Sequence, residues 1–236
     1  MKIGLVSYQC KNKDVAYNMR QIERAMKEAQ GKASLLCFGE AFLQGFDSLT
    51  WNFAIDCEIA VERSSETIDR LCEWTKIYGI ALLTGYIERD GDSLYSSCIV
   101  IENGRILHNY RRISEGWKEI GIADGHYREG DQTGEFRLFD RMFMPALCGD
   151  LWDCPERFKT DHMLIWPVYV CYSEEQWKQE ELAAYAEQAG NVADDVVMIN
   201  SIDPDNDSIG GAFRIRKGRI VERLPFGKEG ILYSEL

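Results

Sequence analysis

The sequence predicts a single α/β domain in which helices cover a mixed β-sheet. In the first third of the chain, short apolar runs typical of buried strands alternate with longer segments of helical periodicity. Further along, strand-like runs follow one another around hairpin turns such as Asn103–Gly104 and Lys217–Gly218. The length of 236 residues suits one α/β domain. We therefore expect a single domain over residues 1–236.

The individual elements follow from the spacing of the apolar residues. Helices are expected where these residues recur every three or four positions, over Val15–Gln30, Ala60–Tyr78 and Glu174–Ala193. Strands are expected at the remaining apolar runs, which are Lys2–Ser7, Ser34–Phe38, Ile80–Gly85, Tyr95–Glu102, Arg105–Tyr110, Phe143–Leu147, Met163–Val170, Val196–Asn200, Gly211–Arg216 and Arg219–Arg223. Because hairpins give antiparallel pairs and helical crossovers give parallel ones, the order predicts a mixed sheet.

The charge balance excludes several classes of partner. The chain carries 39 acidic and 27 basic residues, a formal net charge of −12, and this argues against nucleic acid and anionic membranes as partners. No run approaches the roughly 20 apolar residues of a membrane span, and the start MKIGLVSYQC lacks the long apolar region of a signal peptide. We expect a cytoplasmic protein.

Metal and cofactor motifs are not found in the sequence. The 8 cysteines form no C-x-x-C pair and the 3 histidines are far apart, so a zinc site is not predicted. The run from Asp203 to Asp207 resembles the start of a calcium loop, but Ser208 and Arg214 stand where glycine and glutamate belong. No phosphate-binding glycine motif is found. The sequence therefore predicts neither a metal nor a cofactor.

Three apolar strands end on side chains that could carry chemistry. Glu40 follows the second strand, the charged cluster Arg112–Lys118 follows another, and Cys148 follows a third and precedes Gly149. Taken singly, Glu40 is better explained as a solvated acid, the cluster as a solvated charged face, and Cys148 as a small core residue. Together they are a base, a cation and a nucleophile, the parts that acyl transfer through a thioester requires.

The order of these segments resembles the nitrilase superfamily of carbon–nitrogen hydrolases. The resemblance rests on LLCFGEAFLQGF (Leu35–Phe46), LYSSCIVIENGRILHNYRR (Leu94–Arg112), ALCGDLWDCPE (Ala146–Glu156) and GGAF (Gly210–Phe213). One departure is Gly39, where the family usually has proline. The resemblance implies a four-layer α-β-β-α sandwich of nitrilase type that forms a homodimer or a higher homo-oligomer.

The resemblance also implies a Glu-Lys-Cys triad. Cys148 would be the nucleophile, Glu40 the general base, and the Gly149 N–H an oxyanion donor. Which residue takes the role of the triad's lysine is open, because this chain has Arg112 where the pattern expects lysine. Arginine can stabilise an oxyanion but does not readily give up a proton, so chemistry favours Lys118, six residues later. We lean slightly to Lys118.

The expected activity is hydrolysis of a non-peptide C–N bond in a small molecule, through a thioester that releases ammonia or an amine. An amide substrate is favoured because Glu115, in Glu115-Gly116-Trp117, resembles the second glutamate of some amidases. Trp117 and Trp152 are candidate walls of the substrate pocket. Two alternatives stay open: a nitrile hydrolase, and a catalytically silent nitrilase-like binding or assembly protein.

Overall fold

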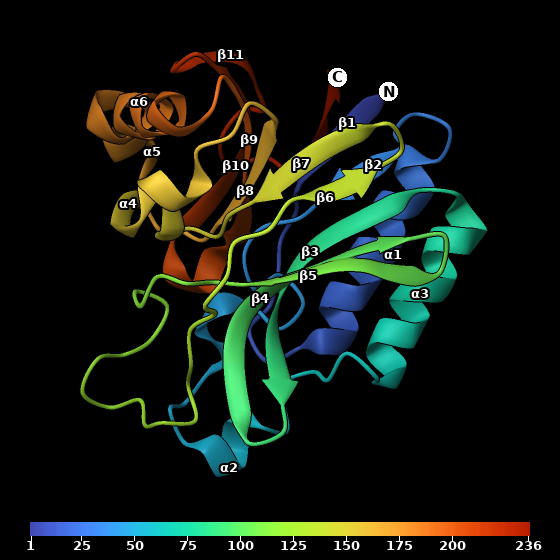
Figure 1. Cartoon of the computed structure of the whole chain (residues 1–236), viewed down its shortest axis with the longest axis vertical. Coiled ribbons are helices and arrows are strands. Elements are labelled where there is room, and N and C mark those ends of the chain that lie inside the picture. The colour runs from blue at the N-terminus through green and yellow to red at the C-terminus, as the bar shows by residue number, and fades with distance from the viewer.

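The computed structural model describes residues 1–236 and contains two six-stranded sheets that pack face to face (Figure 1). The longer helices lie on the outer faces of the sheets. The strands are β1 (Lys2–Ser7), β2 (Leu35–Cys37), β3 (Ala81–Asp90), β4 (Ser93–Glu102), β5 (Arg105–Arg111), β6 (Phe136–Leu138), β7 (Arg141–Pro145), β8 (Met163–Val168), β9 (Asp195–Asp203), β10 (Ser208–Arg216), β11 (Arg219–Arg223) and β12 (Gly230–Glu235). The α-helices are α1 (Val15–Ala29), α2 (Phe53–Asp56), α3 (Glu66–Tyr78), α4 (Asp150–Asp153), α5 (Glu174–Gln176) and α6 (Leu182–Val192).

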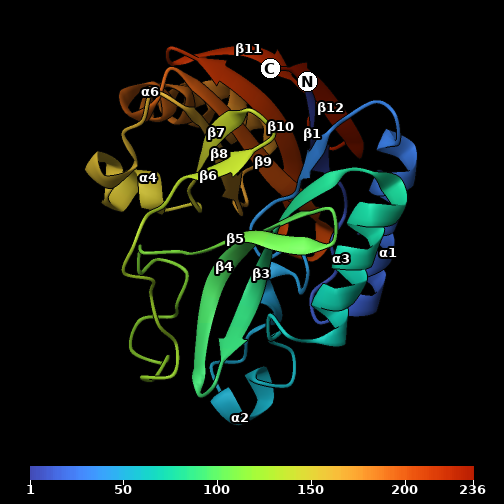
Figure 2. The ribbon, with the colours of Figure 1, turned by 45° about the vertical axis from the view of Figure 1, so that its right-hand side comes forward.

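The first sheet has the order β12-β1-β2-β3-β4-β5. Its centre is parallel, since β2 pairs in parallel with both β1 and β3, and its remaining pairs are antiparallel. Helices α1 and α3 cover its outer face, as Figure 2 shows. An apolar cluster that includes Ile22, Met26 and Leu71 from these helices joins them to the sheet.

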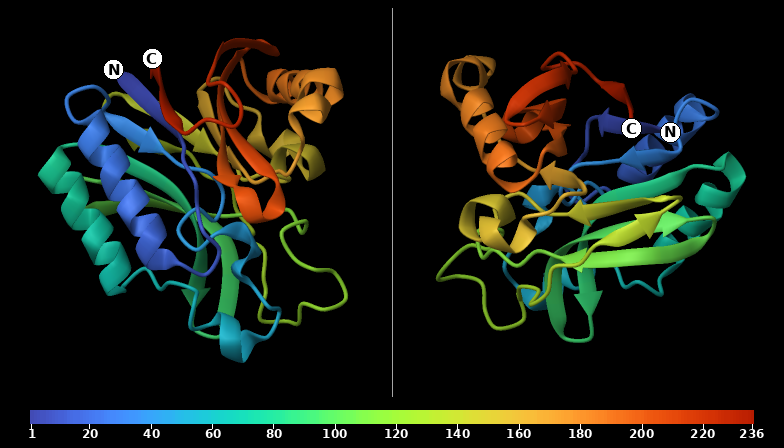
Figure 3. Two further views of the ribbon diagram at one scale, coloured as in Figure 1. Left: turned by 180° about the vertical axis from the view of Figure 1, so that it is seen from behind. Right: turned by 45° about the horizontal axis from the view of Figure 1, so that its top comes forward.

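The second sheet has the order β11-β10-β9-β8-β7-β6. Strands β7, β8 and β9 are parallel, and hairpins complete both edges. Helix α6 lies on the outer face of this sheet, on the side away from α1 and α3 (Figure 3). The two sheets share one core of 35 buried residues, to which both contribute. The layers are therefore helix, sheet, sheet and helix, which confirms the predicted sandwich.

The hairpin turns follow the predicted chemistry. Asn103 and Gly104 have φ values of 45° and 77°, and Lys217 and Gly218 have 48° and 71°. Two consecutive residues with positive φ make the turn type whose twist matches that of the flanking strands. No helix is both long enough and apolar enough to cross a membrane.

Three elements differ from the sequence prediction. The second helix begins at Glu66 rather than Ala60, after an N-cap at Ser65 whose side chain accepts a hydrogen bond from the Ile68 N–H. The long helix near residue 180 contains a π-helical turn over Trp177–Glu181. The strand β12 was not predicted, because its pattern is short and half-exposed and it becomes a strand only by pairing with β1, far away in sequence.

Candidate active site

Glu40, Arg112 and Cys148 meet where strands of the two sheets end. Glu40 follows β2 by three residues and Arg112 follows β5 directly, so both come from the first sheet. Cys148 follows β7 by three residues and comes from the second sheet. Strands β2, β5 and β7 thus bring a carboxylate, a guanidinium and a thiol to one place between the sheets, although the three lie far apart in sequence.

The Glu40 carboxylate is almost completely buried, with 1% of the residue exposed. Its Oε1 accepts hydrogen bonds from Ser96 Oγ at 2.8 Å and from Arg112 Nη1 at 2.9 Å. Its Oε2 is buried and has no hydrogen-bond partner. A buried carboxylate oxygen normally has a partner, so this oxygen is an open acceptor within the site.

The backbone beside Glu40 is held from both sheets. The Glu40 N–H donates to the Val168 carbonyl at 3.3 Å, and the Gly85 N–H donates to the Gly39 carbonyl at 3.2 Å. A Cβ at position 85 would lie 2.7 Å from Glu40 Cα. Only glycine therefore lets β3 come close enough to fix the loop that carries the carboxylate.

Arg112 is the cation next to Glu40, and only 2% of it is exposed. Its Nε donates to Ser114 Oγ at 2.7 Å, while its Nη2 donates no hydrogen bond and lies beside Gly149. Burial lowers the pKa of this guanidinium, but the charge of Glu40 more than offsets it, so the pKa is raised overall. Arg112 therefore carries a permanent positive charge in the site.

Cys148 occupies a backbone conformation that side chains rarely adopt, with φ of 37°. The turn is held on both sides: the Cys148 N–H donates to the Pro167 carbonyl, and Trp166 Nε1 donates to the Cys148 carbonyl, both at 2.9 Å. The thiol Sγ lies 3.6 Å from the Tyr169 carbonyl. Such strain is found at functional sites and persists because the surroundings fix it. The Gly149 N–H donates no hydrogen bond within the chain.

The electrostatics of the site keep the thiol protonated in the resting state. Burial raises the pKa of Cys148 to about 12, the Glu40 charge adds to this effect, and Arg112 opposes it. The thiol therefore needs a base at the moment of reaction, and the carboxylate beside it can serve.

Asp150 ties the loop after Arg112 to the loop of the cysteine. Its buried carboxylate accepts hydrogen bonds from the N–H groups of Ile113 at 3.1 Å, Ser114 at 2.9 Å and Leu147 at 2.8 Å, and from the Tyr110 hydroxyl. Burial raises the pKa of this carboxyl. Asp150, Ser96 and Ser114 were not among the predicted site residues. The only signal in the sequence was that Asp150 and Ser114 lie two residues from Cys148 and Arg112.

Lys118 and Glu115 do not join this group. Lys118 Nζ forms an ion pair with Glu129 and donates to the Tyr127 carbonyl at 3.4 Å. The Glu115 side chain is exposed and forms no hydrogen bond or ion pair. The geometry therefore favours Arg112 over Lys118 as the cation beside Cys148, contrary to the slight preference drawn from lysine chemistry.

The two predicted pocket tryptophans lie in separate aromatic clusters. Trp117 is buried with Leu94 and Tyr127, and its ring centroid is 6.4 Å from that of Trp51. Trp152 lies on α4, is 42% exposed, and packs against Tyr185 with ring centroids 5.1 Å apart. The clusters stand on different elements, so the two residues do not form one wall.

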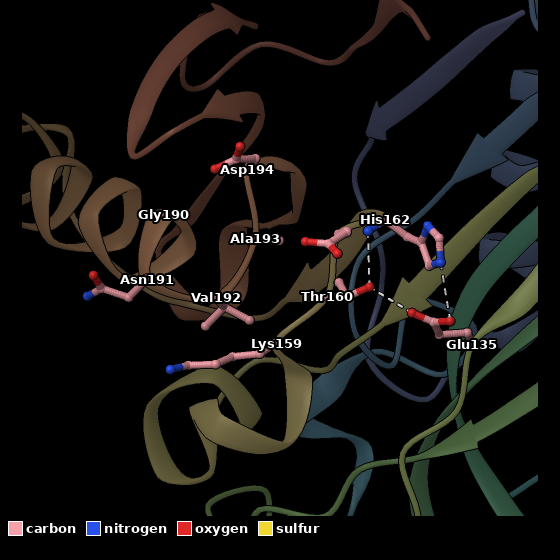
Figure 4. A pocket seen from close by; sticks show the side chains of 10 residues that line it. Glu135, Lys159, Thr160, His162, Gly190, Asn191, Val192, Ala193 and Asp194 are labelled. Atoms are coloured by element: carbon pink, nitrogen blue, oxygen red, sulfur yellow. Dashed lines mark hydrogen bonds and ion pairs between the residues drawn. The ribbon is translucent and has the colours of Figure 1, made fainter.

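Elsewhere, a polar depression lies between the end of α6 and the start of β8 (Figure 4). Glu135 accepts a hydrogen bond from Thr160 Oγ1 at 2.7 Å there, and His162 Nε2 lies 3.6 Å from the same carboxylate. None of the residues that meet at Cys148 lines this depression. No three His, Cys, Asp or Glu side chains are grouped so that they could hold a metal ion.

Comparison with known proteins places the chain in a family. The sequence pattern of the family described as "Carbon-nitrogen hydrolase" matches residues 2–151. A nitrilase of Pyrococcus abyssi is 29% identical over 61% of this chain and 53% of its own length. A glutamine-dependent NAD(+) synthetase of Thermotoga maritima is 24% identical over 59% of this chain and 24% of its own length. The chain thus spans about half or less of these two curated relatives.

Solved structures of similar fold cover nearly the whole chain. A CN-hydrolase superfamily protein of Xanthomonas campestris, which carries an arsenic adduct in its active site, superposes with a TM-score of 0.80 at 17% identity, over 99% of this chain and 89% of that one. An amidase from Nesterenkonia also superposes with a TM-score of 0.80, at 18% identity, over 100% of this chain and 90% of that one. These two likenesses concern the fold.

Fold and site together define an α-β-β-α sandwich in which Glu40, Arg112 and Cys148 meet between the two sheets. The chain belongs to the carbon–nitrogen hydrolase family, within the nitrilase superfamily.

Proposed function

We propose that the protein is a cysteine-dependent amidase of small molecules, and that residues 1–236 act as one catalytic domain. The observation that carries the proposal is the buried Glu40–Arg112 pair beside Cys148, in which one carboxylate oxygen has no partner. That oxygen is the acceptor that the partly buried, protonated thiol needs. We assign Cys148 as the nucleophile and Glu40 as the general base.

The reaction then follows from the atoms of the site. Glu40 takes the thiol proton as Sγ forms a bond to the substrate carbonyl carbon, and the carbonyl oxygen becomes an oxyanion. The oxyanion is stabilised by the Gly149 N–H and the Arg112 charge; losing one such donor typically costs about 2.7–4 kcal/mol of barrier. Protonated Glu40 returns its proton to the nitrogen as the C–N bond breaks, which releases ammonia or an amine.

The second half of the reaction reuses the same groups. Glu40 takes a proton from water while the water oxygen attacks the thioester carbon. The C–S bond breaks and the thiolate regains a proton from Glu40, so the acid is released and the site returns to its starting state. Arg112 keeps its charge throughout and never transfers a proton.

An amide substrate matches the hydrogen-bonding groups of the site. An amide offers a carbonyl oxygen to the free donors at Gly149 and Arg112 and an N–H to the open acceptor of Glu40, so it would use both kinds of group. A nitrile offers only an acceptor nitrogen. The nitrile hydrolase is the second candidate, supported by nitrilases among the curated relatives.

Two measurements test the proposal. The protein is incubated with panels of small amides and nitriles, released ammonia is measured, and intact mass is followed for a covalent adduct. We expect the wild type to release ammonia from an amide. In Cys148→Ala, turnover should fall by about 10³-fold or more. Turnover of nitriles alone would move the assignment to the second candidate. Absence of both ammonia and any Cys148-dependent adduct would favour the silent binding protein.

We also propose that the protein is cytoplasmic and acts as a homodimer or higher homo-oligomer. The proposal rests on the acidic composition and on the family to which the chain belongs. Size-exclusion chromatography with light scattering measures the assembly directly, and a monomer at micromolar concentration would contradict it.

A further inference from the structure

We infer that Ser114 is a positioning residue that holds the Arg112 guanidinium with Nη2 free beside Cys148, in a space that Gly149 keeps open. The inference rests on the proposed function, because it concerns how an arginine acts where the family pattern expects a lysine. It gives Ser114 and Gly149 roles that follow only from their contacts with Arg112.

Each edge of the guanidinium has a different surrounding. Nη1 donates to Glu40 at 2.9 Å and Nε donates to Ser114 Oγ at 2.7 Å. These two bonds lie in the plane of the guanidinium and fix its rotation, because the donors of arginine form a rigid fork. Nη2 is left without a hydrogen bond, so it is the donor available to a substrate.

The Ser114 hydroxyl is itself fixed by the fold. The Ser114 N–H donates to the Asp150 carboxylate at 2.9 Å, and only 2% of Ser114 is exposed. Asp150 also holds the Leu147 N–H, one residue before the nucleophile. The hydroxyl that orients Arg112 is therefore tied to the same carboxylate that orients the cysteine loop, so the positions of cation and thiol are coupled.

Gly149 supplies the room that the guanidinium needs. A Cβ at position 149 would overlap Arg112 Nη2 and lie 3.2 Å from Ser114 Oγ, whereas no other neighbour would be as close. Gly149 has φ of −64° and ψ of −13°, a conformation that alanine also adopts. The glycine is thus required for space beside Arg112 and not for backbone freedom.

The main experiment measures the thiol rather than turnover, so that it needs no substrate. Iodoacetamide alkylation of Cys148 is followed by peptide mass spectrometry at about pH 8, where the rate depends on the thiolate fraction. The exposed Cys171 serves as an internal reference. We expect Ser114→Ala to slow alkylation of Cys148 about tenfold relative to Cys171, because Arg112 loses a bond to its charged group. Ser114→Thr keeps the hydroxyl and should restore the rate.

The matched control is Ser97→Ala. Ser97 is also a buried serine with one hydrogen bond to the polar network, but its Oγ donates to Glu88, away from the thiol. This variant should leave the alkylation rate of Cys148 unchanged. Far-UV circular dichroism and thermal melting of all variants exclude loss of the fold as the cause.

A second variant tests whether Gly149 provides the space that the Arg112 guanidinium needs. Gly149→Ala keeps the N–H but displaces Nη2 and with it the whole guanidinium, which weakens the bonds from Nη1 to Glu40 and from Nε to Ser114. It should therefore slow alkylation of Cys148 several-fold in a background that keeps Arg112. In the Arg112→Lys background, which lacks Nη2 and Nε, both Gly149→Ala and Ser114→Ala should have little further effect. Such non-additivity is the sign of one coupled unit.

The outcomes separate this inference from the proposed function. If wild-type Cys148 is never alkylated and no substrate turns over, the proposed function fails. If Cys148 reacts in the wild type but Ser114→Ala and Gly149→Ala leave its rate unchanged, the inference is overturned while the function stands. Equal losses in the wild type and in the Arg112→Lys background would also overturn it.

Discussion

Two neighbouring arginines pair with buried glutamates, and the two pairs differ in how completely they are satisfied. Arg111 and Arg112 follow one another at the end of β5 and point to different carboxylates, Glu88 and Glu40. Both carboxylate side chains are 0% exposed. Burial and charge pairing therefore do not distinguish them, whereas their remaining hydrogen bonds do.

The Glu88 carboxylate has partners on both of its oxygens. Arg111 donates to both of them at 3.0 and 2.7 Å, Ser97 and Asn109 donate to Oε2 at 2.7 and 2.9 Å, and Arg63 approaches Oε1 at 3.1 Å. The second pair leaves Glu40 Oε2 and Arg112 Nη2 open. A saturated buried network stabilises one conformation, while an unsaturated one has donors and acceptors to offer a ligand.

The largest expected contrast is between the two glutamates. Glu40→Gln should lower turnover by about 10²–10⁴-fold, because the proposed general base is lost, and should also destabilise the fold, because the buried Arg112 is left with a neutral partner. Glu88→Gln should leave turnover per folded molecule unchanged but destabilise the fold by up to about 3–5 kcal/mol, because Arg111 and Arg63 lose their shared charged partner and Arg111 keeps only Asp90. Steady-state kinetics and urea unfolding measure the two effects. Equal losses of activity would remove the distinction.

The arginines should show the same contrast on a smaller scale. Arg112→Ala should lower turnover about 10²–10³-fold by removing charge from the oxyanion. Arg111→Ala should reduce stability and not the rate of folded enzyme. The control is Arg112→Lys, which keeps a charge and should retain more activity than alanine. Should Arg111→Ala be the more damaging to turnover, the assignment of the two pairs would be reversed.

The stability of the fold at low pH gives a further test of the role of Glu88. Burial raises the pKa of Glu88, but hydrogen bonds from Arg111, Ser97 and Asn109 outweigh burial, so its pKa lies below the ordinary 4.5. The ionised carboxylate therefore stabilises the fold above pH 4.5, and this contribution disappears as the pH falls further. Thermal midpoints measured through this range should fall less steeply in Glu88→Gln than in the wild type. An unchanged slope would contradict the role given to Glu88.

The smallest expected effect belongs to Lys118. Lys118→Ala removes a partly buried ion pair with Glu129 and no group beside Cys148. Turnover should change by less than about threefold, with a loss of stability of about 1 kcal/mol or less. The comparison with Arg112→Ala in the same assay decides between the two cations. A larger loss of turnover in Lys118→Ala would make Lys118 the cation of the proposed mechanism.

The sequence predicts that Glu40 and Cys148 lie in one site, as they do in the structure, but it does not predict which cation lies beside them. The positions of Glu40 and Cys148 could be predicted because each follows a buried strand and lies in a segment that resembles the family pattern, although β2 and β7 belong to different sheets. The cation could not be predicted, because the path of the chain after Arg112 depends on a hydrogen bond from the Ser114 N–H to Asp150, which lies 36 residues further along the chain. Strand β12 escaped prediction for the same reason, since its partner β1 lies at the other end of the chain.

The division of the site between the two sheets has a consequence for partly unfolded forms. Glu40 and Arg112 belong to one sheet and Cys148 to the other, and the carboxylate of Asp150 joins them. A compact state that keeps both sheets but lets them slide would retain its far-UV circular dichroism while losing the alignment of the three groups. Catalysis would then be a stricter gauge of native packing than any spectrum of secondary structure.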